Sequence, residues 1–589
     1  MKTFFKSVFA SFIGFILGAI VLFLILIAAI EGIIYAAENE QTSIVSNSIL
    51  HITLQHPISD RSPQNPFRNI DLLNLNTKPI IGLNDVIKCI QNAASDKNIK
   101  AIYLDISNLQ TGWASVEEIR NALIIFKKSK KKIIAYSEIY TQKAYYLASV
   151  ADKIYLNPQG YLEFKGLNTE YVFLKGTLEK LGIEPQIIRV GTYKSAVEPF
   201  INDKMSDASR KQTSELLNNL YQHFIKQISL FRGINQDTLL NIANELRVRN
   251  AIDAVKTRLI DQLKYKDEVL NELQSICGVE SIQDLSQIPL DEYTKAEINS
   301  NQEYSKNRIA IIYATGDIVG GEGSEDDIGS EAFSKIIRNI RLDNKIKAVV
   351  LRINSPGGSA LASDIIWREV ALTQKIKPVI VSMGDVAASG GYYIACAAQK
   401  IVAEPNTITG SIGIFGIIPN LKNFFNNKLG ITFDGVKTAK FADLGAVYRP
   451  LTEDEKLILQ KEIERGYQTF ISKVALGRKK QLTEIDQIAQ GRVWSGIEAK
   501  KNGLIDTIGG LNTAVAIAKK EAKLTEYQLV EYPKQKNFLS TIMADISDKT
   551  QNQLLNKELG EHAIYYRELK KLSKLYGSQA RLLYSLDIH

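Results

Sequence analysis

Short apolar runs alternate with stretches of helical spacing over most of this chain. The runs 348–353 and 378–383 are rich in valine and isoleucine, as buried β-strands usually are. Apolar residues then return at helical spacing, for example over 392–398. This alternation predicts repeated β/α units with largely buried strands, and therefore an α/β fold.

The N-terminus has a different pattern. Lys2 and Lys6 precede an uncharged apolar run over 7–30, which as a helix is long enough to cross roughly 30 Å of hydrocarbon. A cleaved signal peptide has a shorter apolar region, of about 7–15 residues, so we expect a retained anchor rather than cleavage near Ala36 or Ala37. The positive residues before the span predict a cytoplasmic N-terminus, with the rest of the chain across the membrane.

The remainder of the chain contains an internal repeat. Residues 99–106 (IKAIYLDI) match 346–353 (IKAVVLRI), and residues 144–158 match 391–405, both at an offset of 247 positions. Two separated matches in one register indicate a duplicated unit. The sequence therefore predicts two tandem copies of one α/β domain after the anchor.

These matches divide the chain into six parts. The parts are a membrane anchor over 1–36, a linker over 37–83, a first repeat over 84–270, an inter-repeat segment over 271–307, a second repeat over 308–522 and a C-terminal tail over 523–589. The linker is expected to be an exposed tether because it contains Pro57, Pro63 and Pro66. The tail is expected to be helical because its apolar residues have helical spacing at Tyr565, Leu569, Leu572 and Leu575.

Composition narrows the function classes. Apolar residues make up 45% of the 589 residues and charged residues 23%, as in a globular protein that folds in water. The net charge of +8 is not concentrated in a long basic block with interleaved aromatics, so nucleic acid is not an expected partner. Cys89, Cys277 and Cys396 lack metal-binding spacing and are expected to be buried apolar residues.

Two glycine-rich turns follow apolar strands in the second repeat, at 354–358 and 384–391. The second turn holds Ser389 between Ala388 and Gly390, so that little steric cover surrounds its hydroxyl. The start of a helix at this point favours negative charge beside the hydroxyl. Ser389 is therefore the predicted nucleophile.

The same turns provide backbone N–H groups for an oxyanion hole. We expect the N–H of Gly390 and one from Gly357 or Gly358 to face the developing charge. At the equivalent positions the first repeat has Gln142 instead of the serine, and 107–110 (SNLQ) instead of the first glycine turn. The fold is repeated but the nucleophile is not, which distinguishes these turns from ordinary strand-to-helix connections.

A serine nucleophile needs a base. The histidines all lie outside the glycine turns, at positions 51, 56, 223, 562 and 589, so a Ser-His-Asp triad would need a distant residue such as His223. The repeat instead points to Lys194, which aligns with Ala442 of the second repeat. Each repeat thus holds one half of a Ser/Lys pair. Lys437 and Lys440 are rival bases near the equivalent position.

Three segments, RVGTYKSAVEPF (189–200), NSPGG (354–358) and MGDVAASGGYYIA (383–395), resemble the long, duplicated form of the signal peptide peptidase A family. The resemblance extends from residue 1 to about 522 and implies a Ser389/Lys194 dyad on a Clp protease and crotonase-like fold. It also implies a homotetramer in the bacterial inner membrane, with a periplasmic catalytic body that degrades released signal peptides and other hydrophobic peptides. One departure is Asp385-Val386, where a polar second residue is common.

Two other functions are compatible with parts of this pattern. A crotonase-like acyl-thioester enzyme would also use such glycine turns, but would have acidic catalytic residues in them and no anchor. A non-catalytic membrane scaffold would be indifferent to replacement of Ser389. The peptidase mechanism needs no metal or cofactor, and Ser355 and Ser359 are the alternative nucleophiles.

Overall fold

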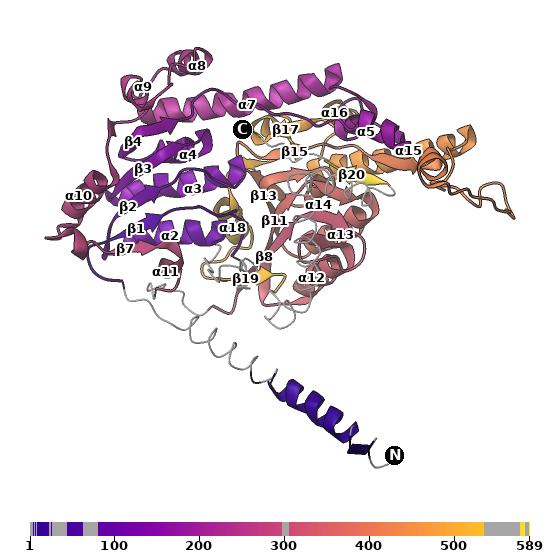
Figure 1. The fold of residues 1–589 in the computed structure, drawn as a ribbon, viewed down its shortest axis with the longest axis horizontal. Coiled ribbons are helices and arrows are strands. Elements are labelled where there is room, and N and C mark those ends of the chain that lie inside the picture. Colours follow the sequence, from indigo (N-terminus) through magenta and orange to yellow (C-terminus); the bar gives the residue numbers. More distant parts are fainter. Residues whose placement is uncertain are drawn as a thin grey trace.

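The computed structural model describes residues 4, 6–7, 9–22, 25, 44–62, 81–296, 305–534, 578–582 and 588. Two largely parallel sheets, one in each repeat, lie next to each other and carry helices on both faces (Figure 1). The predicted α/β fold is therefore confirmed.

The first sheet has six strands, and every neighbouring pair is parallel. Ile49 and Leu50 are neighbours on β1 (Ser48–Ile52), and their side chains point to opposite faces of the sheet. Each joins a different apolar cluster, so both faces are buried. In sheet order the strands are β6 (Gln262–Leu263), β4 (Lys153–Leu162), β3 (Lys132–Tyr140), β2 (Ile99–Asp105), β1 (Ser48–Ile52) and β7 (Gln287–Pro289).

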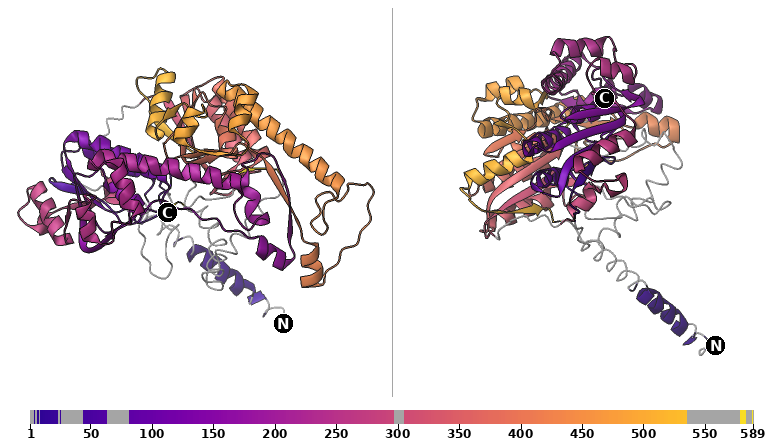
Figure 2. Two further views of the ribbon diagram at one scale, coloured as in Figure 1. Left: turned by 90° about the horizontal axis from the view of Figure 1, so that it is seen from above. Right: turned by 90° about the vertical axis from the view of Figure 1, so that its left-hand side faces the viewer.

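Most helices of the first repeat lie on the two faces of this sheet, whereas α5 (Lys175–Leu181) and α6 (Glu198–Ile201) pack with a strand of the second repeat (Figure 1). The other helices of the first repeat are α2 (Leu83–Ser95), α3 (Trp113–Phe126), α4 (Gln142–Ala148), α7 (Asp207–Arg232), α8 (Gln236–Asn244), α9 (Ala251–Lys256), α10 (Lys266–Cys277) and α11 (Leu290–Thr294). Short 3₁₀ turns are η1 (Lys127–Ser129), η2 (Ser195–Val197) and η3 (Ile282–Asp284). The long helix α7 extends from the first repeat across to the second (Figures 1 and 2).

The second sheet has eight strands. They are β17 (Val493–Ser495), β15 (Ile408–Gly410), β13 (Val379–Ala388), β11 (Ile346–Ser355), β8 (Arg308–Thr315) and β19 (Gln528–Tyr532), with β14 (Lys400–Ala403) and β18 (Thr507–Ile508) joined beside β13. The helices are α12 (Ser330–Leu342), α13 (Ala360–Gln374), α14 (Gly390–Ala395), α15 (Glu453–Arg478), α16 (Leu482–Ile488), α17 (Gly496–Lys501), α18 (Leu511–Glu521) and the π-helix η4 (Phe424–Leu429).

The two sheets share the same arrangement of parallel strands, and one residue pair recurs at equivalent positions. Ile139 pairs with Tyr161 where β3 meets β4, and Val386 pairs with Ile408 where β13 meets β15. Both members of the second pair lie 247 positions after those of the first, which is the offset found in the sequence. The duplication is thus a property of the fold as well as of the sequence.

The sheets extend beyond the predicted repeat boundaries. β1 lies in the predicted linker, β7 in the inter-repeat segment and β19 in the predicted tail, yet each pairs with a strand of a sheet. The sequences of these three strands have no match in the other repeat, so the comparison of the two repeats could not include them. Residues 565–575, for which a helix is predicted, lie outside the described residues.

A third, mixed sheet joins the repeats to each other. Its order is β10 (Asp327–Gly329), β9 (Asp317–Val319), β12 (Gly357–Ser359), β20 (Gln579–Arg581), β16 (Phe415–Asn420) and β5 (Glu184–Arg189). β5 of the first repeat runs antiparallel to β16 of the second over six residue pairs. Because of this pairing, the residues that follow β5 lie against the second repeat.

Buried charges also connect the repeats. The Arg352 guanidinium on β11 donates to Asp60 at 2.8 Å and to Glu118 of α3 at 2.6 Å, and all three side chains are buried. Asp385 in the second glycine turn accepts hydrogen bonds from the backbone and the hydroxyl of Ser115 on α3. Because an unpaired buried charge is costly, these contacts hold the strand before Ser389 against the first repeat.

Residues 4, 6–7, 9–22 and 25 are helical. Within the described part of the chain, no helix is both long and apolar enough to cross a membrane. The other residues of the predicted span over 7–30 lie outside the described residues.

Candidate active site

Ser389 lies at the point where β13 ends and α14 begins. Its backbone has φ +54° and ψ −111°, a conformation that costs energy for a residue with a side chain. The bend is held by a 2.8 Å hydrogen bond from the Ser389 N–H to the Gly410 carbonyl. The side chain is completely buried. A strained, fixed backbone here sets the direction of the hydroxyl.

Lys194 reaches this hydroxyl from the first repeat. The loop after β5 is attached to the second repeat by the Tyr193 N–H, which donates to the Gln490 carbonyl at 2.9 Å. Two glycines leave room for the lysine side chain: a Cβ at Gly491 would lie 2.6 Å from the Lys194 Cβ, and one at Gly413 would lie 3.2 Å from its Cδ. The path of the lysine therefore depends on glycines in the other repeat.

The two predicted catalytic side chains are in contact. The Lys194 Nζ lies 2.9 Å from the Ser389 Oγ, and it also lies 3.1 Å from the carbonyl oxygen and 3.0 Å from the Oγ of Ser411. The Ser389 Oγ lies 3.4 Å from the Gly413 carbonyl oxygen. The amine thus has three oxygen neighbours, of which one is the candidate nucleophile.

Burial favours the neutral form of the Lys194 amine, which can accept a proton. Only 1% of the Lys194 surface is exposed, and loss of hydration lowers its pKa to about 7. A neutral amine has two N–H donors for Ser411 and one lone pair for the Ser389 hydroxyl hydrogen. A protonated amine would donate to all three oxygens, and the hydroxyl would then turn to Gly413. Near neutral pH the site can adopt the arrangement required of a general base.

The two glycine turns predicted to form the oxyanion hole lie next to each other. The Gly357 N–H donates to the Ser355 Oγ at 3.1 Å, so it does not face the site. The next residue, Gly358, lies on β12 opposite β20. The Gly390 nitrogen lies 2.6 Å from the position that a Cβ at Gly357 would take, which brings the two glycine turns together. Of the two sequence alternatives, the geometry favours Gly358 as the partner of Gly390.

The rival groups lie elsewhere. Lys437 and Lys440 are largely exposed, and they pair with Asp443 and Asp454. His223 is buried on α7, with its Nε2 3.4 Å from Glu117. Within the described structure, the contacts of these three side chains are with other residues and not with Ser389.

Ser355 and Ser359 have structural contacts of their own. The Ser355 Oγ donates to the Gly316 carbonyl at 2.6 Å, and the Ser359 Oγ accepts from the backbone of Ala362 at the start of α13. Both hydroxyls therefore stabilise the backbone around β12.

The first repeat shows what the same position does without a nucleophile. Gln142 donates to the Gly166 carbonyl at 2.8 Å and accepts from the Lys165 and Gly166 N–H groups. Gly166 and Gly413 are 247 positions apart, as are Gln142 and Ser389. The glutamine amide thus satisfies the backbone turn that in the second repeat surrounds the serine, and this closes the equivalent site.

Ser411 was missed by the sequence reasoning. It lies in a Gly-Ser-Ile-Gly segment, and its counterpart at the same offset in the first repeat is Phe164. Extending the repeat comparison to this segment would have found a second polar residue present only in the second repeat. Its position beside Lys194 makes it the residue that orients the amine.

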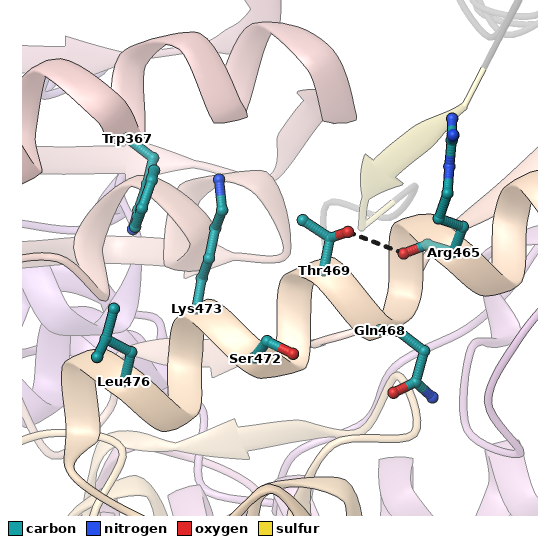
Figure 3. Close-up of a pocket in the computed structure, with 7 residues that line it drawn as sticks. All are labelled: Trp367, Arg465, Gln468, Thr469, Ser472, Lys473 and Leu476. Carbon is teal, nitrogen blue, oxygen red and sulfur yellow. Dashed lines mark hydrogen bonds between the residues drawn. The ribbon is translucent and has the colours of Figure 1, made fainter.

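A surface pocket lies away from these residues. It is formed by Trp367 of α13 and one side of α15, where Lys473 extends over the Trp367 ring and Thr469 donates to the Arg465 carbonyl (Figure 3). None of the candidate catalytic residues lines it. The pocket is therefore separate from the Ser389 site.

Comparison with known proteins identifies the class. The family model "Peptidase family S49" matches residues 125–280 and again 371–525, and the "Clp protease" model matches 300–409. The chain is a serine peptidase with a duplicated domain. It belongs to peptidase family S49, which confirms the resemblance seen in the sequence and decides against the crotonase-like alternative.

Individual relatives cover most of the chain. Protease 4 of Haemophilus influenzae is 35% identical over 98% of this chain and 95% of its own length. Protease 4 of Salmonella typhi is 39% identical over 80% of this chain and 77% of its own. The chloroplastic serine protease SPPA of Arabidopsis thaliana is 37% identical over 87% of this chain and 76% of its own.

Proposed function

We propose that this chain is a membrane-bound endopeptidase that degrades released signal peptides and other hydrophobic peptides, with Ser389 as nucleophile and Lys194 as general base. The observation that carries the proposal is the 2.9 Å contact between the Lys194 Nζ and the Ser389 Oγ, made by a buried amine whose pKa is lowered to about 7. The substrate class rests on the family resemblance.

In this mechanism Lys194 takes the proton of the Ser389 hydroxyl while the Oγ attacks a peptide carbonyl. The N–H groups of Gly358 and Gly390 stabilise the negative charge on the carbonyl oxygen. Lys194 then gives its proton to the leaving amine, and a water molecule hydrolyses the resulting ester. Ser411 keeps the amine in place through both steps because two of its oxygens accept from Nζ.

Labelling with a fluorophosphonate tests the nucleophile. We expect the purified full-length protein to lose activity against a hydrophobic peptide in step with incorporation of one phosphonate, and peptide mapping to locate the label on Ser389. The lowered pKa of Lys194 is the reason, since it activates this hydroxyl above other serines. Labelling of Ser355 or Ser359 instead, or stoichiometric labelling with full activity, would refute the assignment.

We also propose a single-pass anchor in the bacterial inner membrane, with the catalytic body on the periplasmic side. The support is the apolar run over 7–30 after Lys2 and Lys6. In spheroplasts of a bacterial host, added protease is expected to degrade the body after residue 31 without lysis of the membrane. Protection of the body until lysis, while a periplasmic marker is degraded, would reverse the proposed orientation.

A homotetramer is the proposed assembly. Within the chain, β5 pairs with β16. The segment equivalent to β5 in the second repeat lies near 432–437, and the segment equivalent to β16 in the first repeat lies near 168–173. Both segments have exposed apolar residues, such as Phe433, Val436 and Val172. Figure 2 shows the segment between β16 and α15 projecting from the body. Pairing of these two segments between neighbouring copies would repeat the β5/β16 contact and generate a closed ring.

A further inference from the structure

The side chain of Gln212 connects the loop that carries Lys194 to the second repeat. Gln212 lies on α7, the helix that extends from one repeat to the other (Figure 2), and only 4% of its surface is exposed. Its Nε2 donates to the Tyr193 carbonyl at 3.0 Å and to the Ser195 Oγ at 2.8 Å, so both neighbours of Lys194 are held. Its Oε1 accepts from the Val493 N–H of β17 at 3.3 Å. One amide thus uses its donors and its acceptor between the two repeats.

The main chain that Gln212 binds in the second repeat also supports the nucleophile. Val493 is opposite Gly410 where β17 pairs with β15. The Gly410 carbonyl accepts the 2.8 Å hydrogen bond from the Ser389 N–H, and the next residue, Ser411, contacts the lysine amine. The Gln212 side chain therefore links the main chain on both sides of the base to the strands that hold the nucleophile.

The comparison of the two repeats separates this glutamine from the shared fold. The helices α7 and α15 are equivalent and have 26 residues each, so Gln212, the sixth residue of α7, corresponds to Ile458 of α15. Ile458 is apolar and 42% exposed. The repeat with Lys194 has the buried glutamine, and the repeat with Ala442 at the lysine position does not. This distribution indicates that the glutamine serves the base.

The charged side chains around the lysine loop form ion pairs with one another. On the side of β5 and α6, Arg189 donates to the Lys194 carbonyl at 3.3 Å and lies 3.9 Å from Glu198. On the facing elements, Glu215 of α7 pairs with Arg492, which precedes β17. Burial is the cause that lowers the pKa of Lys194. The neutral state of the amine therefore depends on close contact between the loop and the second repeat.

We infer that Gln212 is a positioning residue for Lys194, whose amide holds the lysine loop against the second repeat and so keeps the amine out of water and beside the Ser389 Oγ. This rests on the proposed function, in which Lys194 is the general base. The hydrogen bonds of Gln212 go to the main chain and to Ser195, so it takes no part in proton transfer itself. Without the amide, its buried partners lose their hydrogen bonds and the loop moves away from β17. Water then reaches the amine and favours its charged form.

The pH dependence of kcat/KM for a hydrophobic peptide, measured on the full-length protein and on Gln212→Met, tests this inference. Methionine has a similar length but makes none of the three hydrogen bonds. We expect the acidic limb to move about one pH unit toward alkaline pH, so that kcat/KM falls about tenfold at pH 6 and returns close to the unmodified value near pH 9. Gln222→Met, at an exposed position on the same helix, is the matched control and should leave the profile unchanged.

An unchanged profile in Gln212→Met, or a loss of the same size at pH 6 and pH 9, would overturn the inference and leave the proposed function standing. If thermal unfolding shows that Gln212→Met does not fold, Gln212→Asn decides the question. Its amide is one methylene shorter and cannot reach both the loop and β17, so the limb should move in the same direction, and an unmoved limb would overturn the inference. An unmodified protein without an acidic limb near pH 7 would refute Lys194 as the base, and this inference with it.

Discussion

Replacing Ser389 with alanine is expected to lower peptide hydrolysis by at least about 10⁴-fold, because loss of a serine nucleophile leaves only the binding and oxyanion contributions. The variant should fold normally. Its methyl group occupies the same space, and Lys194 keeps both contacts with Ser411. Turnover of a hydrophobic peptide, with thermal unfolding of the same sample, measures both expectations.

Ser334→Ala is a matched control for this variant. Ser334 is also a buried serine, and its hydroxyl has no hydrogen-bond partner within the described part of the chain, so its removal should change neither turnover nor unfolding. Substantial turnover by pure, folded Ser389→Ala protein would mean that the nucleophile is another residue. Loss of the folded state would instead show that the strained backbone at Ser389 depends on its hydroxyl.

Much of this architecture could be predicted from the sequence because the chain contains two copies of one domain. A match at one offset predicted equivalent strands, and the residue pair Ile139/Tyr161 of the first sheet recurs 247 positions later as Val386/Ile408 of the second. The comparison also separated Ser389 from Gln142 and Lys194 from Ala442, which suggested a site shared between the repeats. A single copy would have given only a serine in a glycine-rich turn.

Other features depend on contacts that no local pattern contains. The Gly357 N–H turns to Ser355, so the choice between Gly357 and Gly358 is made by a side chain two residues earlier. β20 has only three residues, and its strand conformation comes from the two edges that it pairs with. The short strand β7 is likewise defined by its partner β1. Tertiary pairing determines these features, and sequence periodicity does not.

Replacing Lys194 with arginine is expected to abolish turnover, with a loss of at least about 10³-fold. A guanidinium remains protonated at every pH at which the protein folds, so it cannot take the Ser389 proton. It is also bulkier than the amine, in a channel where Gly413 and Gly491 already approach the side chain closely. Turnover of the same hydrophobic peptide by purified Lys194→Arg protein measures the effect.

The pH dependence of the unmodified enzyme tests the same base. Because burial lowers the pKa of Lys194 to about 7, the active neutral amine predominates above pH 7 and is lost below it. We therefore expect kcat/KM to rise about tenfold per pH unit below neutrality and to level off above it. An unperturbed lysine near 10.4 would give a rise that continues to alkaline pH, and keeping the amine neutral at pH 7 corresponds to about 5 kcal/mol.

Lys437→Ala and Lys440→Ala are the matched controls for this base, since both lysines pair with exposed or partly exposed carboxylates outside the site. Each should retain full turnover and the same acidic limb, because neither side chain contacts Ser389. If Lys194→Arg hydrolysed the peptide normally while Lys440→Ala did not, the base would belong to the same repeat as the nucleophile. The site would then be complete within one repeat. The contact that β5 and the loop after it make with the second repeat would be structural only.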